Sequence, residues 1–174
     1  KHVVSGEGNW ESRLVNVKEE MVSGTMYVAP WYDYRRKIKS AVVDLKEITD
    51  VSDMFFYCVN LTEVDFTNFD TSDVAAFAGM FEHCEKMKNL NLSSFNTQNA
   101  NSMVDMFWCC YSLETLDISG FSTENVEYMS GMFGFCKKLK AIDVSSFDTS
   151  KCIEMADMFG NCSALEELDL SNFN

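Results

Sequence analysis

The sequence predicts an α/β fold in which the chain winds as a right-handed solenoid, with one short parallel strand and one helical segment in each repeating turn. Three observations support this prediction. Five cysteines stand 26 residues apart, at Cys58, Cys84, Cys110, Cys136 and Cys162. The residues around them repeat with the same period, without insertion or deletion. Within each period the spacing of apolar residues changes once, from alternation to steps of three and four.

The repeat divides residues 54–174 into four complete units and one partial unit. Each unit follows the pattern Met-Phe-x-x-Cys-x-x-Leu-x-x-Leu-Asp-Leu-Ser-x-Phe-Asp-Thr-x-x-Val-x-x-Met-x-x. A period of 26 residues is too short for an array of helical hairpins and lies within the range of leucine-rich repeats. We therefore expect full repeats at 54–79, 80–105, 106–131 and 132–157, followed by a partial repeat at 158–174.

The strand of each turn is predicted where apolar and polar residues alternate. In the first unit this alternation covers residues 64–67, and the corresponding segments are 90–93, 116–119, 142–145 and 168–171. One turn cannot bury its own apolar residues, so neighbouring turns must stack. The strands then form a parallel sheet with about 4.8 Å between successive turns.

The helical segment is predicted from apolar residues at steps of three and four, which cover one face of a helix or of a run of 3₁₀ turns. In one unit these residues are Val74, Phe77, Met80, Phe81, Cys84 and Met87. A residue of the N-cap type, which accepts a hydrogen bond from an unpaired backbone N–H, precedes each stripe. These residues are Asp70, Asn96, Ser122 and Asp148.

The region before the first full repeat is predicted to contain an N-terminal cap at 1–37 and a degenerate turn at 38–53. A shift by one full period places Ile38 and Val43 opposite Val64 and Phe69. Residues 1–37 have no such register, and they hold two of the three tryptophans and the only proline. Such a segment is expected to shield the open end of the core, as a solenoid requires.

Composition and charge exclude several classes of protein. A hydrophobic content of 47% excludes a disordered chain. The formal net charge of −13 would repel the phosphate backbone of a nucleic acid. No apolar run approaches the roughly 20 residues that span a bilayer. The chain begins at Lys1 without a secretory signal, so we expect it to be a processed or excised piece of a longer protein.

The sequence contains no motif for catalysis or for a bound metal or cofactor. Its histidines are His2 and His83, and it has no Gly-rich phosphate loop, nucleophile elbow or His-Glu-x-x-His motif. It also has no Cys-x-x-Cys pair of the kind that binds zinc. We therefore expect no enzymatic activity, no cofactor and no metal.

The repeating cysteines are predicted to be buried, reduced thiols that pack as small hydrophobic side chains, with no disulfide among them. Cys109 differs, because its column also holds Tyr57, His83, Phe135 and Asn161, a mixed set typical of partly exposed positions. Cys109 is therefore the candidate for a reactive or cross-linking thiol.

The predicted ligand surface is the outer face of the sheet, which we expect to be concave. Side chains that alternate with the core point away from it and stack in rows along the sheet. The resulting strip is acidic and suits a basic partner, but a structural ladder of hydrogen bonds to Ser and Thr neighbours explains the row as well. Its candidate residues are Glu63, Asp65, Thr115, Asp117, Asp143, Glu167 and Asp169. Aromatic residues on the convex side form the alternative surface: Phe56, Tyr57, Trp108 and Phe135.

The repeat resembles the BspA-like leucine-rich repeats of mycoplasma-type lipoproteins and other bacterial surface proteins. The resemblance covers Met54 to Asn174, and the segment from Ser23 to Lys39 is similar to the lead-in of such arrays. It implies a cell-surface or secreted protein that attaches to host matrix, other cells or secreted proteins. The marks of the family are Met132-Phe133-Gly134-Phe135-Cys136-Lys137-Lys138-Leu139 and Leu168-Asp169-Leu170-Ser171-Asn172-Phe173.

The sequence leaves three hypotheses for function. The first is a non-catalytic adhesion or protein-binding module whose concave face binds a protein with a basic patch. The second is a structural spacer that projects another domain. The third is an intracellular interaction scaffold, which the unpaired cysteines favour. Because the array stops within a unit at Asn174, an end-to-end contact between copies is a further expectation.

Overall fold

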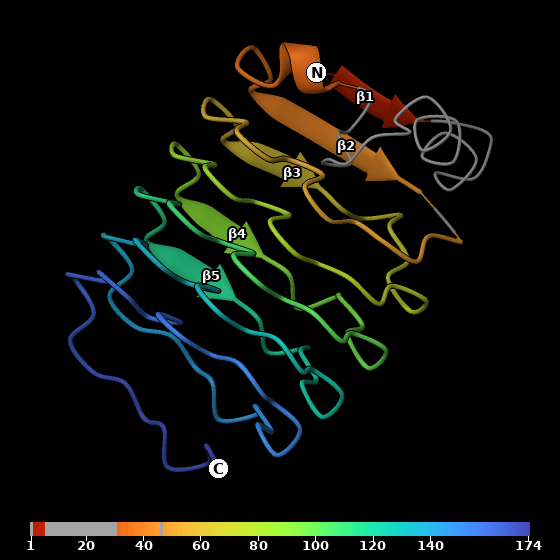
Figure 1. Cartoon of the computed structure of the whole chain (residues 1–174). Coiled ribbons are helices and arrows are strands. Elements are labelled where there is room, and N and C mark those ends of the chain that lie inside the picture. Colours follow the sequence, from red (N-terminus) through yellow and green to blue (C-terminus); the bar gives the residue numbers. More distant parts are fainter. Residues whose placement is uncertain (1, 6–30, 46) are drawn as a thin grey trace, which may run out of the picture.

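The computed structural model describes residues 2–5, 31–45 and 47–174. Successive turns of the chain lie side by side in sequence order, with the strands along one side of the stack (Figure 1). Most of the predicted cap at 1–37 lies outside the described residues. The elements are β1 (His2–Ser5), the 3₁₀ helix η1 (Tyr32–Tyr34), β2 (Ser40–Asp44), β3 (Glu63–Asp65), β4 (Asn89–Asn91) and β5 (Thr115–Asp117).

The strands pair in parallel and form two sheets, one with the order β1-β2-β3 and one with the order β4-β5. Between β4 and β5 the register follows the repeat, with Leu90 opposite Leu116. Three of the predicted strands are present, although each is only three residues long. The segments 142–145 and 168–171 are not strands. They belong to the last two turns of the stack.

The register between β2 and β3 differs from the predicted one. Ala41 lies opposite Val64, so the expectation that Ile38 occupies this position is wrong by three residues. Burial is the physical reason, because Ala41 and Val43 are buried and alternate with more exposed neighbours. An odd shift in register exchanges the two faces of a strand, so these apolar side chains fix the pairing. The full period holds on the opposite wall, where Asp50 bridges Ala76.

The predicted helical segment forms a wall of turns instead of a helix. Within the described residues, η1 is the one helix. Left-handed backbone conformations, with φ between 53 and 63°, recur four residues apart in each turn and interrupt helical geometry. They occupy two columns, Asp53, Gly79, Asp105, Gly131 and Asp157, and Tyr57, His83, Cys109, Phe135 and Asn161.

The residues that were predicted to cap a helix therefore form hydrogen bonds within turns. Asp70, Asn96 and Asp148 each accept a hydrogen bond through Oδ1 from the N–H two residues later, at 2.9, 3.1 and 2.8 Å. This is the geometry of an Asx turn, which the same residue types favour.

Backbone hydrogen bonds between successive turns hold this wall together. Val51, Asp53, Phe55 and Tyr57 donate their N–H groups to carbonyls of the following turn, at 2.9 to 3.0 Å. The N–H groups between them close local turns, as in the bond from Cys58 to the carbonyl of Phe55. The same pattern recurs in the next three turns, so each interface contains four bonds that point in one direction.

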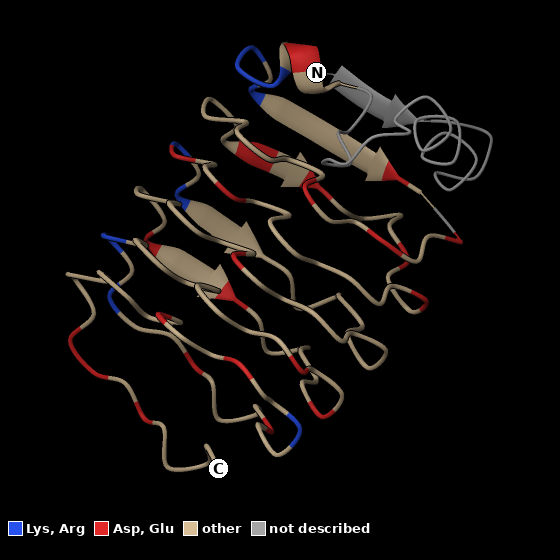
Figure 2. Ribbon diagram, viewed as in Figure 1, with Lys and Arg blue, Asp and Glu red and all other residues tan. Residues whose placement is uncertain are grey.

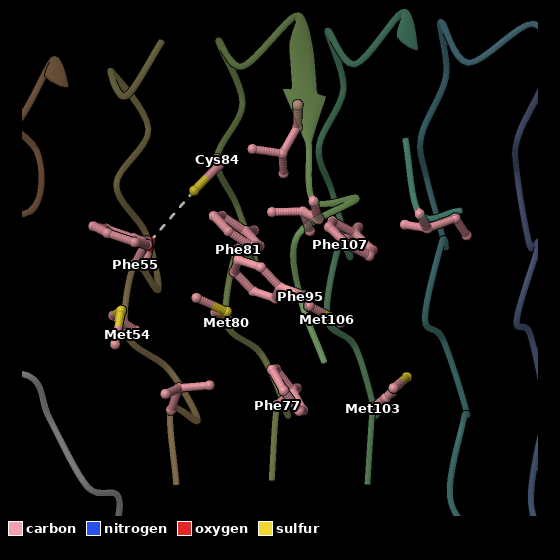
Figure 3. Packing of buried hydrophobic residues seen from close by; sticks show 14 of the residues in the cluster. Met54, Phe55, Phe77, Met80, Phe81, Cys84, Phe95, Met103, Met106 and Phe107 are labelled. Carbon is pink, nitrogen blue, oxygen red and sulfur yellow. Dashed lines mark hydrogen bonds between the residues drawn. The ribbon is translucent and has the colours of Figure 1, made fainter. Parts of the chain in front are cut away.

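The core lies between the strands and the wall of turns, and its side chains stack in columns (Figure 3). Phe55, Phe81, Phe107 and Phe133 are completely buried, and their ring centroids are 5.6 to 5.7 Å apart. The methionine column beside them, represented by Met80, is also buried. The predicted assignment of these columns to the core is confirmed.

Buried threonines join each turn to the next on the strand side. The Thr97 hydroxyl accepts a hydrogen bond from the N–H of Ser122 and donates one to its carbonyl, both at 2.8 Å. Thr71 and Thr123 make the same pair of bonds one turn before and one turn after. One buried side chain therefore satisfies two backbone groups of the following turn.

Replacing Thr97 with Val should lower the free energy of unfolding by about 2 to 3 kcal/mol, because both backbone groups of Ser122 would lose their partner. Urea denaturation followed by circular dichroism measures the change. Thr97→Ser keeps the hydroxyl and should cost much less. Equal stability of Thr97→Val and the wild type would contradict the proposed role of the hydroxyl.

Candidate functional site

The seven residues predicted to bind a ligand all lie exposed along the strand side, and we call them the strand-face row. Glu63 and Asp65 begin and end β3, and Thr115 and Asp117 begin and end β5. The acidic ends of β3 and β5 are visible in Figure 2. The other members occupy the corresponding positions of the last two turns: Asp143, Glu167 and Asp169.

The aspartates of this row accept hydrogen bonds from their own turns. Asp65 Oδ1 accepts bonds from the N–H and the hydroxyl of Thr67, at 3.0 and 2.6 Å. Asp117, Asp143 and Asp169 each accept one from the N–H of the serine two residues later, at 3.1, 3.0 and 2.9 Å. These bonds support the structural interpretation of the row as a hydrogen-bonded ladder.

The same hydrogen bonds keep the row charged. Bonds from the following serine lower the pKa of the carboxyl groups of Asp117, Asp143 and Asp169. Asn91 occupies the same column without a charge, and its Oδ1 accepts bonds from the N–H and hydroxyl of Ser93 at 2.9 and 2.7 Å. The column therefore accommodates either Asp or Asn, and the charge is not needed for its geometry.

Two shallow depressions, both open to solvent, cross the strand face. The first lies over β4 and β5 and contains Thr115 and Asp117 of the predicted row, with Leu90 and Leu116 beneath them. Asn89 and Asn91 complete its lining. The second lies where the two sheets separate, and its lining is Val64, Phe66, Thr67, Phe69, Asn91, Ser93 and Ser94.

The aromatic residues of the alternative surface largely pack against other residues of the protein. The rings of Phe56 and Tyr57 lie 4.7 Å apart, and those of Trp108 and Phe135 lie 4.9 Å apart. The indole of Trp108 covers Gly134, where an added Cβ would overlap the ring. All four aromatic residues are partly buried. Glycine in the next turn thus explains how a tryptophan fits here.

Cys109 is not the partly exposed thiol that the sequence predicts. Its relative exposure is 5%, and its φ of 60° differs from the ordinary extended or helical backbone. Burial raises the pKa of the Cys109 thiol, whereas its hydrogen bond with Tyr111 acts in the opposite direction. A buried thiol of raised pKa is a poor nucleophile, so Cys109 lacks the features of a reactive cysteine.

The five repeating cysteines form a ladder of their own. Cys84 Sγ donates to the carbonyl of Phe55 at 3.4 Å, shown as a dashed line in Figure 3. Cys110, Cys136 and Cys162 contact the carbonyls of phenylalanines of the preceding turn in the same way. The first four are buried, as predicted, and Cys162 is partly exposed. Burial raises the pKa of Cys110 to about 12.

All seven cysteines are free thiols in the structure. A thiol reagent should therefore modify the native protein chiefly at Cys152 and Cys162, the two that are partly exposed. Denaturation without a reductant should expose the other five. Counting reactive thiols before and after denaturation tests this, and a count that does not rise on denaturation would contradict the buried ladder.

A second acidic group, which the sequence analysis did not single out, lies on the wall of turns. Burial, with a smaller effect of Asp50, raises the pKa of Asp53 to about 6. Burial and the charges of Asp105 and Asp53 raise the pKa of Glu82 to about 7. The Asp53 carboxylate lies over Gly79, where an added Cβ would overlap it. Alternation of Asp and Gly in this column is the sequence signal that could have revealed the group.

The acidic group on the wall of turns consists of carboxyl groups with raised pKa values. Among the described residues, no set of three or more His, Cys, Asp or Glu side chains is arranged to hold a metal ion. Its chemistry is that of carboxyl groups that resist ionisation, because both burial and mutual repulsion favour the protonated form.

Glu82 should make the protein less stable as the pH rises from its usual carboxyl pKa of 4.5 to about 7. Because its pKa is raised, Glu82 binds its proton more tightly in the folded state than in the unfolded state. The contribution of this proton to the free energy of unfolding is full below pH 4.5 and is lost above pH 7. Glu82→Gln should remove about 1 kcal/mol of this pH dependence, allowing for solvent screening.

The measurement is the difference in the free energy of unfolding between wild type and Glu82→Gln at pH 5 and pH 8. This difference isolates Glu82 from carboxyl groups such as Asp117 and Asp143, whose lowered pKa values have the opposite effect. An identical difference at both pH values would show that Glu82 titrates normally.

Comparison with known proteins identifies a family. No curated protein and no solved structure gives a significant match to the chain. No helix among the described residues is long and apolar enough to cross a membrane. A family described as a Mycoplasma protein of unknown function, DUF285, matches residues 24–140 and, in a second match, residues 111–174. Because the two matches together extend over most of its length, the chain belongs to the DUF285 family.

Proposed function

We propose that this chain is a BspA-like leucine-rich-repeat solenoid that works as a non-catalytic protein-binding or adhesion module. The observation that carries the proposal is the strand-face row, a line of exposed acidic side chains on the outside of successive turns. Membership of a family of Mycoplasma proteins supports a bacterial repeat protein. A location at the cell surface or outside the cell follows from the resemblance to BspA-like proteins.

The chemistry of the row suits a partner with a basic patch. Hydrogen bonds orient the carboxylates of Asp117, Asp143 and Asp169 before any ligand arrives, so binding requires little further ordering of these side chains. Lys88 and Lys140 lie exposed just before the strand positions and offset part of the charge. Complementary charge of this kind accelerates association and makes its rate depend on salt.

An intracellular interaction scaffold is the second candidate, and one observation favours it. All seven cysteines are free, as in proteins from reducing compartments. The same strand-face row would serve either location. A structural spacer that projects another domain is the third possibility, and it would make no use of the row.

Charge removal from the row should weaken binding of a basic probe. A triple variant with Asp117→Asn, Asp143→Asn and Asp169→Asn keeps the turn geometry, as Asn91 demonstrates in the same column. Fluorescence anisotropy with a labelled ten-lysine peptide should show about tenfold weaker binding and a flatter salt dependence.

A matched control removes the same charge elsewhere. Asp70→Asn, Asp73→Asn and Asp148→Asn change exposed residues outside the row, and Asn96 shows that the column of Asp70 and Asp148 accepts Asn. This control should bind the probe nearly as well as the wild type. If the two triple variants lose equal affinity, binding reflects net charge alone, and the strand face is not the binding surface.

A further inference from the structure

Lysine and arginine residues gather along one edge of the stack, where the strands begin (Figure 2). Lys39 directly precedes β2, and Lys88 directly precedes β4. The whole chain has a formal net charge of −13, so this edge differs in sign from the rest of the molecule. We call its exposed lysines the basic edge, and they are Lys37, Lys39, Lys86, Lys88, Lys138 and Lys140.

The basic edge is periodic, because its cations occur in every second turn. From one turn to the next, the column of Lys88 reads Lys39, Thr62, Lys88, Glu114 and Lys140. The neighbouring column reads Lys37, Asn60, Lys86, Ser112 and Lys138. Pairs of lysines therefore recur about 9.6 Å apart, which is twice the spacing of adjacent strands. Neutral or acidic side chains separate these pairs.

Hydrogen bonds between turns keep these columns in register. The N–H of Glu114 donates to the carbonyl of Lys88 at 2.7 Å. In the neighbouring column, Lys86 Nζ donates to Asn60 Oδ1 at 2.6 Å, and Asn60 Nδ2 donates to the carbonyl of Arg36 at 2.7 Å. An ammonium group has three donors, so this bond leaves Lys86 two more for a ligand.

A linear acidic polysaccharide matches the period of the basic edge. Each glycosidically linked sugar advances its chain by roughly the distance between neighbouring strands, so one sugar corresponds to one turn of the protein. A polymer with an acidic group on every second sugar would therefore place its anions against successive lysine pairs. Its uncharged sugars would face the turns between, where their hydroxyls can donate hydrogen bonds to a carboxylate such as that of Glu114.

Other polyanions match the edge less well. A polymer with an acidic group on every sugar would bring anions against Glu114, and like charges repel. In an extended peptide, about three residues span two turns of the protein, and side chains three apart point to opposite faces. An anionic membrane surface has no period that would match the alternation of Lys88, Glu114 and Lys140.

We propose that the basic edge binds a linear polysaccharide that carries a carboxylate or sulfate on every second sugar. The polymer lies along the edge and crosses successive turns, with its anions on the lysine pairs and its neutral sugars between them. This inference adds a second binding surface to the protein. It does not depend on a ligand of the strand-face row.

Hyaluronan is the probe, because it carries a carboxylate on every second sugar. A fluorescently labelled decasaccharide of hyaluronan should bind the full chain, and added salt should weaken the binding. A galacturonate oligomer of the same length has a carboxylate on every sugar and should bind about tenfold more weakly in spite of its higher charge. Equal or tighter binding of the galacturonate oligomer would overturn the proposal.

A charge reversal in the basic edge tests its location. Lys88→Glu should weaken hyaluronan binding about tenfold, and Glu114 and Glu166 show that the column accepts Glu. Lys151→Glu is the matched control, because Lys151 is exposed, lies outside the basic edge and shares its column with Asp73. The control should bind nearly as well as the wild type. Equal losses in the two variants would show that binding follows net charge alone, which would overturn the proposal.

Glu114→Lys tests the alternation itself. It places a cation in the turn between two lysine pairs, at a column position where Lys88 and Lys140 show that Lys fits. This variant should gain far more affinity for the galacturonate oligomer than for hyaluronan, because only the former has an anion at that point. An equal gain for both polymers would contradict a match between the two periods.

Two further probes distinguish other classes of partner. A peptide of repeated Glu-Pro-Pro forms a polyproline II helix whose carboxylates recur about 9.3 Å apart. If this peptide binds more tightly than hyaluronan, the partner is an acidic protein. If the chain binds phosphatidylserine vesicles but not hyaluronan, the partner is a membrane surface. Either result would overturn the proposal.

Discussion

The backbone hydrogen bonds between residues one turn apart are the constraint on which the rest of the structure depends. Buried N–H and carbonyl groups must be paired, and on the wall of turns many of the partners lie in the next turn, as for Phe55 and Met80. An insertion of one residue would misplace four bonds and every core column together. The uninterrupted 26-residue period of the sequence is the consequence of this requirement.

The same bonds give the stack a direction. Left-handed residues such as Asp53 and Tyr57 turn alternate N–H groups toward the following turn, while the groups between them close local turns. At each interface on this wall, four bonds therefore run from the earlier turn to the later one, and fewer run back, as from Ala75 to the carbonyl of Thr49. Before the first full repeat, a side chain takes the place of a backbone donor, since the indole N–H of Trp31 donates to the carbonyl of Met54 at 2.8 Å.

On the strand face, the carboxylates of the proposed recognition surface also have a structural role. The carboxylate of Asp117 closes its own turn through one oxygen, and this bond helps to keep the group ionised. On the wall of turns the pKa shift has the opposite direction, because Glu82 is partly buried beside other carboxyl groups and holds its proton more tightly. The carboxyl groups of the two acidic surfaces thus have pKa values shifted in opposite directions.

By itself, the sequence determined the period, the core columns and the positions of the strand-face row, because periodic burial is visible in a single chain. Tertiary structure decided the turns in place of a helix, the register of Ala41 against Val64, and the burial of Cys109. It also decided the pairing of Thr97 with Ser122 and the raised pKa of Glu82. The reason is common to all of them: each depends on contacts between residues one turn apart, and local residue spacing carries no record of those contacts.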